Sequence, residues 1–194
     1  HFTELSGFMM ADDGAIDAIE LAKDGTVSSV YPLTGNEEAM GLDILIDPER
    51  KISATIAKDS GEYTIAGPFH LVQGGDGALL FDPVYVKDED GQEKFWGFTI
   101  LVIDWEKFIG EVQLEKLEEA SYYYQVWKKN PDTGKKVTIA QCEKPVLDNA
   151  LEVACEVPND TWYFEICPKE GWYSKSQLWI CLLYTSPSPR DAHE

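Results

Sequence analysis

The chain has no long apolar run. None of its stretches approaches the roughly 20 consecutive apolar residues that a membrane-spanning helix needs. It also has no initiator Met and no signal peptide, because the sequence opens on His1 without a basic and apolar leader. These absences lead us to expect an internal piece of a longer protein.

Basic residues are scarce. Lys and Arg together number 16 against 35 Asp and Glu, which gives a formal net charge of −19. A surface of that sign repels the phosphates of nucleic acids and of anionic lipid headgroups, so neither is an expected direct partner. Acidic surfaces are common because they are well solvated, so the charge alone does not identify a ligand.

Histidine and cysteine are scarce too, which argues against several kinds of catalytic site. Only His70 lies away from the chain ends, and acyl-transfer triads and zinc sites need more partners than one His. We therefore expect no catalytic residue, no metal and no cofactor. Cys142, Cys155 and Cys167 lack CxxC spacing and are expected to be buried thiols; a Cys142–Cys155 disulfide in an oxidising compartment is the alternative.

The end of the chain differs from the rest in composition. The string CLLYTSPSPRD at Cys181–Asp191 corresponds to one reading frame of a sequencing-library adaptor. We therefore expect the natural sequence to stop near Ile180 and exclude the tail from fold reasoning. A natural flexible linker is the alternative.

The chain does have enough apolar sequence for a core, with 44% hydrophobic and 12% aromatic residues. Residues 15–33 alternate around an Asp-Gly turn and predict a hairpin. A short helix capped by Asn36 and reaching Leu42 is expected next. A second helix then follows, capped by Asp47 and ended by Gly61.

Strands dominate the remainder. In the first half we expect strands at 62–66, 69–73, 78–86 and 95–103. Asp104 can cap a connecting helix over 105–120. In the second half we expect strands at 121–129, 136–141, 150–158 and 161–168. The predicted fold class is α+β, with two PAS-like antiparallel-sheet subdomains in tandem.

Several phrases occur in an order that is typical of one family. They are VYPLTGNE at 30–37, GLDIL at 41–45, SGEYTIAGPFHLVQGG at 60–75, DPVY at 82–85, FWGFTILVID at 95–104 and VPNDTWYFEICPKEGW at 157–172. With them, residues of about 14–172 resemble the CHASE sensory domain, the extracytoplasmic part of bacterial sensor kinases, diguanylate cyclases and plant cytokinin receptors.

The resemblance implies a division of the chain. Its parts would be the end of a long N-terminal stem helix (1–13), a membrane-distal PAS-like ligand-binding subdomain (14–104), a connecting helix (105–120), a membrane-proximal PAS-like subdomain (121–173), the start of a juxtamembrane segment (174–180) and the adaptor tail (181–194). Homodimerisation through the stem helices and anchoring in the membrane are also implied.

The ligand site that the resemblance implies lies in the membrane-distal subdomain. Asp43 matches an acid that anchors the ligand, and Ile65 matches a residue that offers main-chain groups. The full set of expected ligand-binding residues is Asp43, Ile65, Gly67, Phe69, Leu71, Leu80 and Phe98. From the residues alone, Asp43 is either a ligand anchor or a cap for its own turn.

Arg50 is a further charged residue near this site. It is expected on a helix surface, paired with Asp47 or Glu49, or reaching toward an acidic ligand.

The function we expect is that of an extracytoplasmic small-molecule sensor in a membrane-bound receptor. The resemblance implies a cytoplasmic histidine kinase or diguanylate cyclase as output, so this fragment itself would not be an enzyme. The alternative is a ligand-free dimerisation or scaffold module. A hydrolase that uses two of Asp43, Asp82 and Asp104 is disfavoured, because none of them lies beside a His or a cluster of metal ligands.

Overall fold

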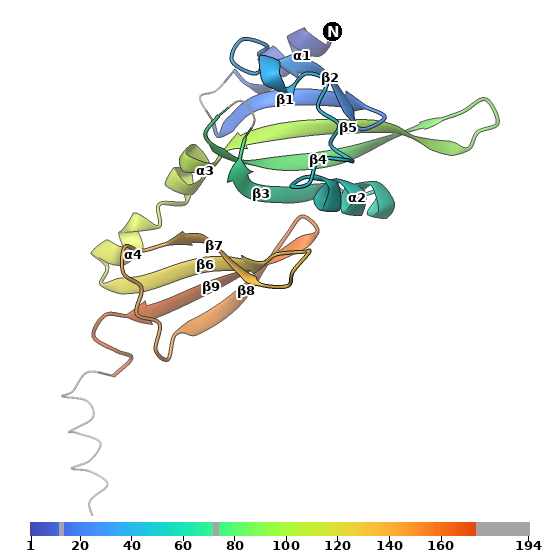
Figure 1. Cartoon of the computed structure of the whole chain (residues 1–194). Coiled ribbons are helices and arrows are strands. Elements are labelled where there is room, and N and C mark those ends of the chain that lie inside the picture. The colour runs from blue at the N-terminus through green and yellow to red at the C-terminus, as the bar shows by residue number, and fades with distance from the viewer. Residues whose placement is uncertain (12–13, 72–73, 174–194) are drawn as a thin grey trace, which may run out of the picture.

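Two antiparallel sheets make up the molecule, one above the other in Figure 1. The computed structural model describes residues 1–11, 14–71 and 74–173. The expected juxtamembrane segment and adaptor tail, from 174 onward, lie outside the described residues. No helix in the described part of the chain is long and apolar enough to cross a membrane.

The first sheet defines what we call the five-stranded subdomain. Its strands are β1 (Ile16–Lys23), β2 (Thr26–Tyr31), β3 (Thr64–His70), β4 (Asp76–Lys87) and β5 (Glu93–Asp104). They lie in the order β2-β1-β5-β4-β3, and all pairs are antiparallel. The β1–β2 hairpin confirms the Asp-Gly turn: Asp24 and Gly25 have φ of 54° and 94°.

The second sheet defines the four-stranded subdomain. Its strands are β6 (Tyr122–Lys129), β7 (Lys136–Gln141), β8 (Leu151–Val157) and β9 (Asp160–Pro168), in the order β7-β6-β9-β8. This sheet is also antiparallel throughout. The predicted α+β fold, with two PAS-like sheets in tandem, is thereby confirmed.

A short helical layer covers one face of the five-stranded sheet. It holds the single 3-10 turn η1 (Glu37–Ala39) and the helix α2 (Lys51–Ser60). The predicted first helix was to reach Leu42 and is therefore shorter than expected. The Asn36 side chain does not cap it, because its amide donates to the carbonyl of Pro32 instead (3.0 Å).

The second helix starts later than the sequence predicts. The Asp47 carboxylate accepts the backbone N–H groups of Glu49 and Arg50, as a cap does, but residues 48–50 form a turn before α2 begins. At the other end Gly61 takes the left-handed conformation (φ 73°), which confirms the predicted helix stop.

One strand replaces two that the sequence predicts on either side of Gly67-Pro68. β3 runs through this pair, and its register with β4 shifts between Ala66 and Phe69. The separation into 62–66 and 69–73 is therefore wrong. Pro lacks a backbone N–H, but β3 is the edge of the sheet, where a missing donor removes no ladder bond.

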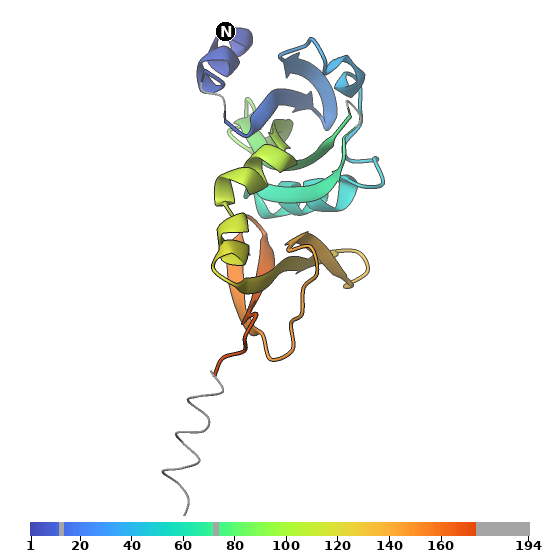
Figure 2. The ribbon, with the colours of Figure 1, turned by 90° about the vertical axis from the view of Figure 1, so that its left-hand side faces the viewer.

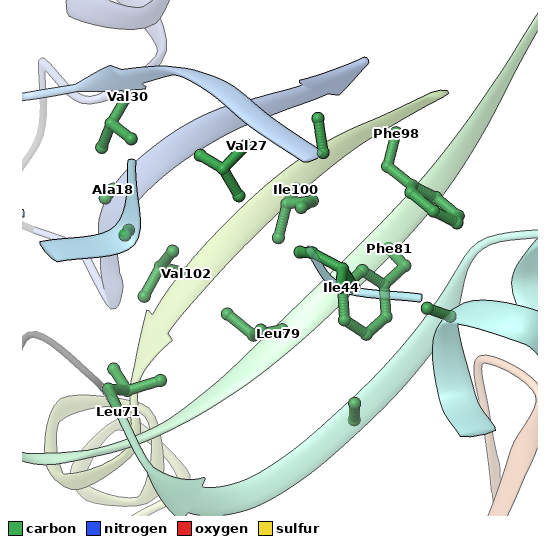
Figure 3. Packing of buried hydrophobic residues seen from close by; sticks show 14 of the residues in the cluster. Ala18, Val27, Val30, Ile44, Leu71, Leu79, Phe81, Phe98, Ile100 and Val102 are labelled. Carbon is green, nitrogen blue, oxygen red and sulfur yellow. The ribbon is translucent and has the colours of Figure 1, made fainter. Parts of the chain in front are cut away.

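The main core lies between the five-stranded sheet and its covering layer. Figure 3 shows side chains of β4 and β5 pointing to one face, where Ile44 of the covering layer meets them. Phe81, Phe98, Ile100 and Ile44 are all fully buried. Burying each such side chain stabilises the fold by about 1.5–3 kcal/mol. The four-stranded subdomain has a smaller core, centred on Leu114, Tyr124 and Cys142.

Two short helices connect the sheets where a single connecting helix is predicted. α3 (Trp105–Val112) and α4 (Glu115–Glu119) run along one side of the molecule, as Figure 2 shows. The Asp104 side chain accepts the N–H of Lys107 at 3.0 Å, which confirms the predicted cap. The break falls at Gln113, which takes the left-handed conformation with φ of 57°.

The turn between β8 and β9 touches the five-stranded subdomain. Asn159 at its tip donates from Nδ2 to the hydroxyls of Ser60 (3.0 Å) and Thr64 (2.8 Å). The N–H of Ile65 donates to the carbonyl of Pro158 (3.1 Å). We call these bonds the inter-sheet contact.

The cysteines in the described part of the chain are all free. Cys142 and Cys167 are buried, as predicted, but Cys155 is exposed. The expectation for Cys155 is wrong because β8 is an edge strand whose apolar face is not covered by any described segment.

Candidate ligand-binding site

A buried carboxyl group stands in the core of the five-stranded subdomain. Glu20 lies on β1 between Ala18 and Ala22, and since side chains two apart share a face, all three point into the core. Glu20 is 4% exposed. No hydrogen bond or ion pair reaches its side chain from residues that the structure describes.

Burial changes the protonation of this group. Desolvation raises the pKa of the Glu20 carboxyl from its ordinary 4.5 to about 7, and the positive charge of Arg50 partly offsets that rise. At neutral pH the carboxyl is therefore close to half protonated. It can donate a hydrogen bond when neutral and accept several when ionised.

Glu20 faces a small cavity together with Arg50. The remaining walls are aliphatic and come from Ala39, Leu42, Ile44, Leu71 and Leu79. The cavity measures about 10 Å³, which is close to the space that a single water molecule occupies. Ligand sites typically combine apolar walls with a few placed polar groups, and this cavity has that composition at a much smaller size.

Arg50 is held in a fixed orientation beside the cavity. Its Nη1 donates to Oδ1 of Asp47 at 2.9 Å, and its guanidinium carbon lies 4.9 Å from the ring centroid of Phe69. The predicted pairing with Asp47 is confirmed. Its position on a helix surface is wrong, because only 3% of the Arg50 side chain is exposed.

Three of the predicted ligand-binding residues lie at or near this cavity. Leu71 forms part of its wall. Phe69 packs under the Arg50 guanidinium. Phe98 lies in the same core, with its ring 5.7 Å from that of Phe81 and 5.0 Å from that of Phe95. All three residues thus belong to the core of the five-stranded subdomain, with Leu71 and Phe98 at opposite ends of it in Figure 3.

Asp43 lies next to the cavity without forming part of its wall. Its neighbours Leu42 and Ile44 line the cavity, whereas Asp43 is half-buried and pairs with Thr26 at the edge of β2. Its Oδ1 accepts the N–H of Leu45 at 3.0 Å, which is the capping role that the sequence left open. A direct contact between Asp43 and a ligand stays a prediction.

The other three predicted residues lie elsewhere. Ile65 uses its N–H in the inter-sheet contact. Gly67 borders an open hollow of about 290 Å³ between α2 and the β6–β7 turn. Leu80 lies on the opposite face of the sheet, in a shallow hollow with Met9 and Tyr63. Their ligand roles also stay predictions.

Sequence reasoning missed Glu20. The alternation in AIDAIELA predicts a hairpin strand, but it does not indicate which face of that strand is the core. In the structure the small residues Ala18 and Ala22 take the core face with Glu20, while Leu21 takes the other face. The sequence signal that could have identified Glu20 is a charged residue flanked, two positions away on each side, by alanine.

The arrangement is that of a tandem PAS-like sensor fold, with two buried charged side chains, Glu20 and Arg50, in its first subdomain. The chain belongs to the CHASE domain family, whose model matches residues 14–137. CHASE domains are sensory modules, so this chain is a sensor domain. No curated protein matches the chain.

A solved structure shares the fold. It is an extracellular ligand binding receptor from Desulfohalobium retbaense DSM5692, with a TM-score of 0.61 and 14% sequence identity. The match covers 84% of this chain and 32% of the receptor, so the chain spans about a third of the receptor's length.

Proposed function

We propose that this chain is the extracytoplasmic small-molecule sensor domain of a membrane-anchored receptor, and that the ligand binds in the core of the five-stranded subdomain. The observation that carries the proposal is Glu20, a buried carboxyl that faces a cavity and has no partner among the described residues. An unpaired polar group costs several kcal/mol to bury. A ligand that hydrogen-bonds to Glu20 would offset that cost.

The output of the receptor would be a cytoplasmic histidine kinase or a diguanylate cyclase. Signals would reach it through a homodimer formed by stem helices. The exposed apolar side chains of α1 (Phe2–Met9) support a helical partner there, since Leu5 and Phe8 are 65% and 83% exposed. A two-component system is one setting for such a receptor. The full gene, read on both sides of this segment, would identify the spans and the output.

The cavity also supports the alternative of a ligand-free scaffold module. A space of about 10 Å³ holds no organic molecule unless the covering layer moves. In a scaffold, the two subdomains would only position the stem helices.

A thermal-shift screen of small polar metabolites separates the two proposals. We expect at least one compound to raise the melting temperature of the wild type, and Glu20→Gln to lose that rise. Glu152→Gln is the matched control, because Glu152 is exposed on β8 in the other subdomain. If a full metabolite set produced no shift in the wild type, the scaffold would be the better account.

Asp43 has its own test within this proposal. If it contacts the ligand, Asp43→Ala should weaken binding about 10- to 100-fold, because a charge-assisted hydrogen bond is worth about 1.5–3 kcal/mol. Titration calorimetry with a compound from the screen measures this, and circular dichroism checks the fold. Equal affinity would leave Asp43 with its turn-capping bond to Leu45 alone.

A further inference from the structure

Two opposite charges face the cavity, and they constrain what it recognises. Among the described residues, Glu20 and Arg50 are the charged ones in its wall, and the other described wall residues are aliphatic. We propose that the cavity recognises a small zwitterion with an aliphatic body, whose anionic group binds Arg50 and whose ammonium group binds Glu20. This inference rests on the proposed function and adds the chemical class of the ligand.

The anionic group of the ligand would bind the Arg50 guanidinium, which is already held in a fixed orientation. Asp47 and the Phe69 ring fix the plane of Arg50, so little side-chain freedom is lost when a ligand binds. A guanidinium has five N–H donors, and Asp47 accepts one of them at 2.9 Å. The donors that remain can bind a carboxylate as a pair of parallel hydrogen bonds.

The cationic end would meet Glu20. No salt bridge within 4 Å joins Glu20 to Arg50 among the described residues, although the Arg50 charge acts on Glu20, and both side chains line the cavity. An ammonium group donates three hydrogen bonds and favours the ionised form of a carboxyl. Binding would therefore drive the proton off Glu20, with the proton released to solvent.

The cavity must enlarge to admit such a molecule, and the structure indicates which wall moves. Ala39, Leu42 and Ile44 come from a segment with one short 3-10 turn, one isolated bridge and no strand, whereas Leu79 comes from a central strand. Three backbone bonds hold this segment to β2 and to the turn before it. They run from the N–H of Val27 to Leu42, from Gly41 to Val27 and from Ile44 to Gly25, each at 2.9 Å. Such a segment opens at lower cost than a paired strand.

L-leucine and two analogues that each lack one charge are suitable probes. 3-Methylbutan-1-amine keeps the ammonium, and 4-methylpentanoate keeps the carboxylate. With the wild-type chain, we expect calorimetry to show L-leucine binding at least about tenfold more tightly than either analogue. Glu20→Gln should weaken L-leucine binding by at least about tenfold, and Glu152→Gln, at an exposed position on β8, should not change it.

Proton release gives a second readout that needs no variant. Titrations at pH 7 in two buffers with different ionisation enthalpies should show net release of protons on binding L-leucine, because the raised pKa leaves Glu20 partly protonated there. A merely structural Glu20 would release none.

Several results would overturn the inference. One is that L-leucine binds no better than the analogues. Another is that Glu20→Gln, folded by circular dichroism, keeps wild-type affinity. If L-leucine does not bind but the metabolite screen finds another ligand, the zwitterion assignment fails and the sensor function stands. If no compound of any class binds, both the zwitterion assignment and the proposed sensor function fail.

Discussion

The two sheets follow the same antiparallel plan but differ in what they bury. The core of the five-stranded subdomain contains 15 buried apolar side chains, against three in the four-stranded subdomain. The first also encloses Glu20 and Arg50, while the β8 strand of the second is exposed along nearly its whole length. A deep core can hold charges away from water at a defined position. The four-stranded subdomain also buries one charge, Lys128, but its Nζ is paired with Asp160 at 3.1 Å, whereas Glu20 has no hydrogen bond among the described residues. We therefore expect recognition in the first subdomain and support in the second.

The largest expected difference concerns ion pairs. Asp47→Ala removes the close ion pair of the buried Arg50 and leaves only the exposed Glu49 carboxylate at 3.9 Å; it also removes the bonds from the N–H groups of Glu49 and Arg50, so the free energy of unfolding should fall by about 3–5 kcal/mol. The matched change in the other sheet, Glu165→Ala, removes a pair with Lys136, which is 43% exposed, and should cost about 0.2–1 kcal/mol. Urea denaturation measures both. Equal losses would show that the two sheets bury charge alike.

Core size gives the next contrast. Ile100 is fully buried and Leu151 is 54% exposed. Ile100→Ala should therefore reduce the free energy of unfolding by about 2–5 kcal/mol, whereas Leu151→Ala should reduce it by less than about 1 kcal/mol. A comparable loss at Leu151 would mean that another segment covers β8 in solution.

The pH dependence of stability should also separate the sheets. The pKa of Glu20 is raised in the folded state, so its stabilising contribution is complete below pH 4.5 and is lost as the pH rises through about 7. Relative to Glu20→Gln, the wild type should lose about 3 kcal/mol between pH 4.5 and pH 8. Glu152→Gln, at an exposed position on β8, is the control and should track the wild type. A pH-independent gap between wild type and Glu20→Gln would contradict the burial of an unpaired carboxyl.

The smallest expected effect lies where the sheets meet. Asn159→Ala removes the side-chain bonds of the inter-sheet contact and should cost about 1–3 kcal/mol. Asn149→Ala is the control, because Asn149 shares the left-handed conformation and none of these bonds. Subtracting the two results removes the backbone effect of replacing Asn. If the losses are equal, the contact contributes nothing to stability.

Local patterns predicted most of the fold correctly. Asp24-Gly25, Gly61 and Asp104 act through their own backbone neighbours, so the sequence determines their turn, helix stop and cap. The single strand through Gly67-Pro68 was missed because its place at the sheet edge depends on pairing with β4, which local sequence does not contain.

The candidate site was less predictable. Phe69, Leu71 and Phe98 were expected and lie on the core face. Glu20 was missed because a two-residue period does not say which face is the core, and here the face with small side chains is buried deepest. The depth of Arg50 depends on how α2 packs, which its local sequence does not determine.

β3 connects the inter-sheet contact to the cavity that Glu20 and Arg50 face. Thr64 and Ile65, at its start, take part in the inter-sheet contact, and the strand leads directly to Leu71 in the cavity wall. The stretch from Thr64 to Leu71 spans at most roughly 23 Å, at about 3.3 Å per residue. A ligand in the cavity that displaced Leu71 would move one end of this stretch, and the four-stranded subdomain is hydrogen-bonded to its other end. We therefore expect hydrogen exchange at the Ile65 amide to change when L-leucine binds, although no ligand atom would come near it.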